Sequence, residues 1–134
     1  MREILFRGKL PSGAWVYGDL RQYPSGVKAI RSDEWGHMME VVPDTVGQYT
    51  GTIDKNGTKI FEGDLVKAIL PATDCRSGFE WPVRPVEYRN GVFGMSVIHN
   101  EIVPFYGYSS SITFEVIGNI HDNQELMEVY NAAD

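Results

Sequence analysis

The chain lacks a second cysteine, a long apolar run and an excess of positive charge. Cys75 is the one cysteine among 134 residues, so no internal disulfide can form, which favours the reducing cytoplasm. No apolar run approaches the ~18 residues of a membrane span, and Glu3 and Arg7 flank an N-terminal stretch unlike a signal peptide. The net charge of −6 disfavours non-specific attraction to nucleic acid or anionic lipid, although a local basic face is compatible with it.

Motifs of catalysis and metal binding are also missing. The sequence contains no G-x-S-x-G elbow, no G-x-x-x-x-G-K-[ST] phosphate loop and no G-x-G-x-x-G fingerprint. His37, His99 and His121 are far apart and none lies at a metal-ligand spacing from another His or from Cys75. We therefore expect no cofactor and no metal, and the sequence assigns no catalytic residue. Cys75 would need a nearby base and a lowered pKa to act as a nucleophile, and a free thiol explains it equally.

The chain contains enough apolar residues to fold without disulfides or a structural metal. Hydrophobic residues make up 43% of the chain, and a chain of this length buries roughly two-thirds of its unfolded surface. We expect one compact domain over residues 1–134. Two small β subdomains, at about 1–45 and 46–134, are the alternative.

Residues 46–66 carry the clearest local pattern, V-G-Q-Y-T-G-T-I-D-K-N-G-T-K-I-F-E-G-D-L-V. Alternation before the turn and a return run at 59–66 rich in β-branched and aromatic residues predict two short strands. Between them, the carboxylate of Asp54 can accept a hydrogen bond from backbone two residues on, and Gly57 tolerates positive φ. The stretch therefore predicts a tight hairpin.

The same turn partly matches an EF-hand calcium loop, through Asp54, Asn56 and Gly57. The first ligand position would be Thr52 and the closing bidentate glutamate would be Gly63. Two oxygen donors are thus missing, and the turn interpretation is preferred.

This central pattern resembles the signature of the YopX family, small proteins of bacteriophages and prophages. Two further stretches agree with this signature. They are R-E-I-L-F-R-G-K followed by W-V-Y-G near the N-terminus, and E-V-I-G-N-I-H-D-N-Q-E-L-M near the C-terminus. The resemblance implies a β-rich fold with an SH3-like barrel portion, and a family with no established enzymatic activity or catalytic residues. The residues that carry the signature are Gly47, Gln48, Tyr49, Thr50, Gly51, Asp54, Asn56, Gly57, Glu62, Gly63, Asp64, Gly118 and Asn119.

The remaining elements complete a mainly β fold with one short C-terminal helix. Asn90-Gly91 is the preferred pair for a two-residue hairpin connection. Asp122 with Glu125 resembles a capping box that begins a helix at about 123–131. We expect partly open SH3-like barrels built from hairpins, with further strands near residues 4–8, 14–20, 27–31, 38–42, 86–89, 92–98, 102–105 and 113–117. Alternation places Trp15 and Tyr17 on one face of the strand 14–20.

The irregular stretch 71–85 is the expected contact surface. Loops longer than ~12 residues are uncommon in compact domains and often bind a partner, although packing of its aromatic residues onto the barrel is the plainer interpretation. Phe79, Trp81 and Arg84 are the candidate partner-binding residues, because Arg and Trp are typical of interface hot spots. The partner would be a host or phage protein in the cytoplasm, and self-association through strand edges is a further expectation.

Two alternatives stay open. The first is a patch that binds single-stranded nucleic acid, with aromatic rings that stack on bases and arginines that neutralise phosphates. Its residues would be Trp81, Arg84, Tyr88, Arg89 and Phe93, but alternation places Tyr88 and Arg89 on opposite faces. A small metal-dependent hydrolase would use acids such as Glu62 and Asp64, which share a face if their strand is regular. A non-catalytic protein-binding module is the preferred function.

Overall fold

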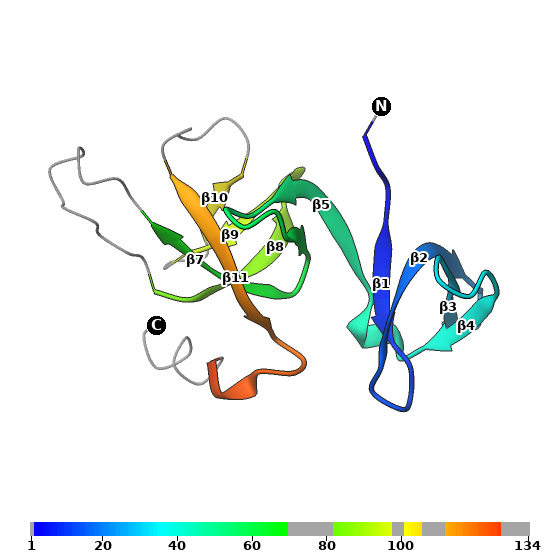
Figure 1. Cartoon of the computed structure of the whole chain (residues 1–134). Helices are drawn as coiled ribbons and strands as arrows, with labels where there is room; N and C mark the ends of the chain where they lie inside the picture. The colour runs from blue at the N-terminus through cyan, green and yellow to red at the C-terminus, as the bar shows by residue number, and fades with distance from the viewer. Residues whose placement is uncertain (1, 70–81, 98–100, 106–111, 127–134) are drawn as a thin grey trace, which may run out of the picture. The chain divides into compact units, whose positions relative to one another are not determined.

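The structure, a computed structural model, describes residues 2–69, 82–97, 101–105 and 112–126 (Figure 1). The chain divides into two compact units, Met1–Gly51 and Thr52–Asp134, here called unit 1 and unit 2. The division lies inside a strand, β5 (Gly47–Ile53), whereas the sequence placed its alternative boundary between residues 45 and 46.

The strands of unit 1 belong to an antiparallel sheet with the order β4-β3-β2-β1-β5-β6, whose edge strand β6 (Lys59–Phe61) follows in the sequence of unit 2. The sheet curls, because the N–H of Val42 donates to the carbonyl of Lys9 at 2.8 Å and the N–H of Lys9 donates to Oγ1 of Thr45 at 2.9 Å. Its elements are β1 (Phe6–Lys9), β2 (Trp15–Gln22), β3 (Lys28–Ser32), β4 (Met38–Val41) and a 3-10 turn, η1 (Pro43–Thr45).

The core of unit 1 lies inside this curl. Val16, Ile30 and Val41 are buried there, each from a different strand. Gly8 packs closely against this core, because a Cβ at this position would lie 3.0 Å from Cβ of Val41 and would require Val41 to shift. The partly buried side chains around this core are Phe6, Leu10, Leu20, Met39 and Val46.

Unit 2 contains a second antiparallel sheet, with the order β10-β9-β8-β7-β11. The turn after β5 leads into β6, and β7 follows two residues later. Asn90 and Gly91 connect β8 to β9 with φ of 55° and 84°, which confirms the predicted hairpin. The strands are β6 (Lys59–Phe61), β7 (Asp64–Ile69), β8 (Arg84–Arg89), β9 (Val92–Ser96), β10 (Ile102–Pro104) and β11 (Thr113–Asn119).

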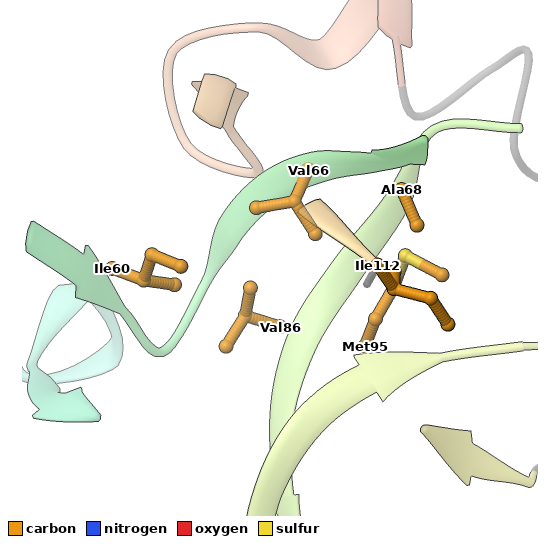
Figure 2. Packing of buried hydrophobic residues seen from close by; sticks show 6 residues of the cluster. All are labelled: Ile60, Val66, Ala68, Val86, Met95 and Ile112. Atoms are coloured by element: carbon orange, nitrogen blue, oxygen red, sulfur yellow. The ribbon is translucent and has the colours of Figure 1, made fainter. Parts of the chain in front are cut away.

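Side chains from several strands of unit 2 point toward one another in a compact core (Figure 2). Burial of each valine, isoleucine or methionine side chain contributes about 1.5–3 kcal/mol. The rings of Phe105 and Phe114 extend the core with an edge-to-face contact at 4.8 Å between centroids. The buried members are Ile60, Val66, Ala68, Val86, Met95 and Ile112.

The mainly β class is confirmed, and the two sheets are open rather than closed into barrels. One strand prediction was wrong: the run 59–66 is not continuous, because Glu62 and Gly63 turn the chain between β6 and β7. Gly63 has a φ of 87°, which glycine adopts without strain.

The described part of the C-terminal helix begins one residue later than expected. Residues 124–126 are helical, and the N–H of Leu126 donates to the carbonyl of Asn123 at 3.0 Å. Asn123, rather than Asp122, therefore occupies the position before the first helical residue. The rest of the predicted helix lies outside the described residues. Within the described ranges, no helix is long and apolar enough to span a membrane.

Candidate functional site

Asp54 is an acceptor for three backbone amides. Its Oδ1 accepts from the N–H groups of Asn56 and Thr58 at 2.8 and 2.9 Å. Its Oδ2 accepts from the N–H of Val116 in β11 at 3.0 Å, across 62 residues of sequence. The carboxylate therefore holds its own turn and joins that turn to a distant strand. The predicted Asx-type turn is confirmed.

The environment of Asp54 favours its ionised form. Burial acts to raise the pKa of this carboxyl. The three amide hydrogen bonds and the nearby Lys55 ammonium act in the opposite direction and outweigh it, so the pKa lies below the ordinary value of 3.8. Lys55 also donates its backbone N–H to the carbonyl of Phe114 at 2.9 Å. Charge and hydrogen bonding thus fix the turn on β11.

This lowered pKa predicts a stability loss in acid. A group whose folded pKa is depressed stabilises the protein above its unfolded pKa and loses that contribution as the pH falls through the folded value. The free energy of unfolding in urea is therefore expected to decline as the pH falls below about 4. The difference in the free energy of unfolding between wild type and Asp54→Asn should decrease over the same pH range. A difference that stays constant from pH ~7 down to pH ~2 would contradict the role of the charge.

A second group of signature residues forms a backbone junction. Gly63 donates its N–H to the carbonyl of Val86 at 3.0 Å, and its carbonyl accepts from the N–H of Ile120 at 2.8 Å. Oδ2 of Asp64 accepts from the N–H of Phe61 at 2.7 Å, so this buried carboxylate closes the turn between β6 and β7. Because that turn separates Glu62 from Asp64, the two residues do not lie in one regular strand, as the acid-pair hypothesis assumed.

The C-terminal signature pair, Gly118 and Asn119, shapes the chain after β11. Oδ1 of Asn119 accepts from the N–H groups of His121 and Asp122, both at 2.9 Å. A Cβ on Gly118 would lie 2.5 Å from Oδ1 of Asn123, the atom that accepts the N–H of Asn119 at 3.0 Å. The pair therefore sets the turn that leads into the helix.

The other signature residues are also placed in the framework. Gly47 and Gln48 pair with Arg7 and Phe6 in the β1–β5 ladder, and the N–H of buried Tyr49 donates to the carbonyl of Leu5 at 2.8 Å. Gly57 has a φ of 83° and donates its N–H to the carbonyl of Asp54 at 3.0 Å. Thr50 and Gly51 continue β5, and Asn56 lies in the turn.

The predicted contact residues are only partly described. Phe79 and Trp81 lie outside the described residues, as do Cys75 and His99. Arg84 lies within β8 and its side chain is 1% exposed. It therefore does not contribute exposed surface, because β8 begins at Arg84 and this residue pairs with Val66 of β7. A contact role for Phe79 and Trp81 stays a prediction.

The predicted nucleic-acid patch on the second hairpin is discontinuous. The rings of Tyr88 and Phe93 contact each other in a tilted arrangement across the β8–β9 pair, at 4.8 Å between centroids. The Arg89 guanidinium forms an ion pair with Glu87, which neutralises its charge locally. Among the described residues, no group of three or more His, Cys, Asp or Glu is placed to hold a metal ion.

A different aromatic and basic surface lies on unit 1. We define the outer face as the side of its sheet opposite the core. On β2 this face alternates Trp15, Tyr17, Asp19 and Arg21, and Tyr23 follows the strand. The guanidinium of Arg7 lies 4.6 Å from the Trp15 ring centroid. The strand register assigns to the outer face Arg7, Lys9, Trp15, Tyr17, Asp19, Arg21, Ala29, Arg31, Met38 and Glu40.

An open hollow lies on this outer face over β2, β3 and β4. It has a volume of about 510 Å³ and is lined by Asp19, Leu20, Arg21, Gln22, Tyr23, Arg31 and Met38. Arg31 lies opposite Asp19 on one side and Met38 on the other, and Arg21 lies in the neighbouring cross-strand row opposite Ala29.

The two arginines at this hollow are held in place. The guanidinium of Arg21 lies 5.1 Å from the Tyr23 ring centroid, and Nη1 of Arg31 donates to the carbonyl of Gly36 at 3.2 Å. Both arginines are exposed. Sequence alternation placed Trp15 and Tyr17 on one face, but strand register was needed to bring Arg31 and Met38 beside Arg21.

The structure defines a mainly β protein. Its signature residues, including the acids and the glycines, hold the backbone framework, and unit 1 carries an aromatic and basic outer face. The chain belongs to the YopX protein family, whose model matches residues 12–128. The matched range contains the central and C-terminal signatures and W-V-Y-G, whereas R-E-I-L-F-R-G-K precedes it. No curated protein matches the chain.

Proposed function

We propose that this protein is a non-catalytic binding module that presents the outer face of unit 1 to a host or phage protein. The observation that carries this proposal is the set of exposed Tyr and Arg side chains on a paired sheet. Tyr17 and Tyr23 are 42% and 38% exposed, and Arg21 and Arg31 lie beside them. Tyr and Arg are enriched among the residues that dominate protein interfaces.

The sheet makes these side chains suitable for recognition. Tyr has few rotatable bonds, so its ring loses little conformational entropy on binding. Strands β2 and β3 each pair with a neighbouring strand on both sides, and this pairing fixes the positions of their alternating side chains. The surface is thus ordered before a partner arrives, which reduces the entropy lost on association.

Single-stranded nucleic-acid binding is a second candidate. The outer face presents three cations to solvent, Lys9, Arg21 and Arg31, against two acids, Asp19 and Glu40, and it interleaves them with aromatic rings. Arg7 lies on the same face but is buried. Stacking of bases on such rings beside cations is the usual mode of single-strand recognition. This candidate function predicts that partners co-purifying with the protein are lost after nuclease treatment, and that its binding to single-stranded nucleic acid weakens steeply as the salt concentration rises.

The proposed function is tested by affinity purification of the tagged protein from its bacterial host, with and without nuclease, followed by mass spectrometry. The variant is Tyr17→Ala, which alters the outer face without lining the hollow. Tyr88→Ala, at a residue 56% exposed in unit 2, is the matched control. We expect a nuclease-resistant protein partner that wild type and Tyr88→Ala retain and Tyr17→Ala loses by about tenfold or more. Equal recovery with all three proteins, or none after nuclease, would contradict the proposal.

A further inference from the structure

The hollow on the outer face concentrates positive charge in a way that the whole chain does not. Unit 1 contains six Lys and Arg residues and six Asp and Glu residues, whereas unit 2 contains six and twelve. The net negative charge therefore belongs to unit 2. Within unit 1, two guanidinium groups and one carboxylate, that of Asp19, line the hollow.

The arginines have donors available for a ligand. A guanidinium has five N–H donors, and Arg31 uses one of them toward Gly36. No ion pair of Arg21 or Arg31 is present within the described ranges of the chain. The planar donor pairs of arginine match the two oxygens of a carboxylate, which makes paired hydrogen bonds with it.

Apolar atoms complete the lining. Met38 borders the hollow from β4 and Tyr23 borders it beyond the end of β2. Methionine is flexible and adapts to differently shaped apolar groups. A volume of about 510 Å³ falls within the range of pockets that enclose small ligands and exceeds the needs of one carboxylate. Room remains for an apolar neighbour of the acid.

We propose that the hollow lined by Arg21, Arg31, Tyr23 and Met38 recognises an acidic segment of the protein partner, in which a Glu or Asp side chain lies next to an apolar residue. The inference rests on the proposed function and names the chemistry of its ligand. The guanidinium groups bind the carboxylate, and Met38 and Tyr23 contact the apolar neighbour.

The number of cations favours an acidic peptide over nucleic acid. Non-specific affinity for a nucleic-acid strand grows with the number of phosphates neutralised, and two arginines supply little of it in an acidic protein. A peptide needs only one or two well-placed carboxylates, because paired hydrogen bonds to Arg are strong and directional.

The test uses fluorescence anisotropy of the full chain with three labelled probes. These are a peptide of repeated Glu-Ser-Leu units, the same peptide with Gln in place of Glu, and oligothymidine. We expect saturable binding of the Glu peptide and about tenfold weaker binding of the Gln peptide. The double variant Arg21→Gln/Arg31→Gln should weaken binding of the Glu peptide by about tenfold or more.

Two further variants separate a site from general charge. Arg2→Gln/Lys28→Gln removes the same charge from unit 1 at residues that do not line the hollow, and should leave affinity unchanged. Asp19→Asn removes the lining carboxylate and should tighten binding of the Glu peptide. Equal weakening by both double variants, or oligothymidine binding more tightly than the Glu peptide, would overturn the inference.

Its failure is distinguishable from failure of the proposed function. If no peptide binds, but the host pull-down yields a protein that Tyr17→Ala loses, the acidic-segment inference is wrong and the binding module stands. If the Glu peptide binds at the hollow but no nuclease-resistant protein is captured, the proposed function fails and the carboxylate preference of the hollow stands.

Discussion

Replacement of Asp54 by Asn is expected to lower the free energy of unfolding by about 3 kcal/mol, since hydrogen bonds to a charged acceptor contribute about 1.5–3 kcal/mol each. The amide keeps one oxygen but puts an NH2 group where the other oxygen accepted an N–H. Either the turn donors of Asn56 and Thr58 or the Val116 N–H then face a donor. Urea unfolding at neutral pH, followed by circular dichroism, measures the loss.

Asp33→Asn is the matched control for this substitution. Asp33 is exposed, so the same chemical change should alter stability by less than ~0.5 kcal/mol. Similar losses for Asp33→Asn and Asp54→Asn would show that the three amide hydrogen bonds of Asp54 do not account for the effect.

Replacement of Gly18 by Ala is expected to destabilise unit 1 by about 3 kcal/mol or more, through overlap with neighbouring backbone. A Cβ at this position would lie 1.8 Å from the carbonyl oxygen of Arg31, and φ at Gly18 is 156°. The neighbouring backbone is fixed, because Asp33 donates its N–H to the carbonyl of Tyr17 at 2.9 Å. Strands β2 and β3 would have to separate locally.

Gly13→Ala separates this overlap from backbone strain alone. Gly13 has a φ of 97°, but its added Cβ meets no atom within 4 Å. The expected cost is therefore about 1–2 kcal/mol. Urea midpoints of both variants provide the comparison, and an amide NMR spectrum shows whether β2 and β3 rearrange. Equal midpoints for Gly13→Ala and Gly18→Ala would contradict the overlap.

Local turn chemistry explains which parts of the fold were predictable. The Asp54–Gly57 turn and the Asn90–Gly91 hairpin depend on side chains and φ values of adjacent residues, so short sequence windows contain the information. The turn at Glu62 and Gly63 was missed although Asp64 holds it locally through the N–H of Phe61, and its other contacts are to the distant residues Val86 and Ile120. The composition of the run 59–66 favoured a strand, whereas the positive φ of Gly63 and these local and distant hydrogen bonds produce a turn.

The burial of Arg84 could not be predicted from the sequence for a related reason. Arg84 carries a side chain typical of interfaces, but its burial depends on the strands around β8. The hollow depends on the register that brings Asp19, Arg31 and Met38 into one row, and no spacing in the sequence encodes that register directly. Alternation along β2 identified Trp15 and Tyr17 as sharing a face, which is the local part of the same surface.

The carboxylate of Asp54 also connects two stages of folding. Its hydrogen bonds to Asn56 and Thr58 close a short loop. Hairpins closed by such short loops form in microseconds. Its hydrogen bond to Val116 joins residues 62 positions apart in the sequence, so it closes a longer loop at a greater cost in chain entropy. We therefore expect this turn to form early and to present an acceptor to β11, so that one side chain contributes to both the hairpin and the completed sheet.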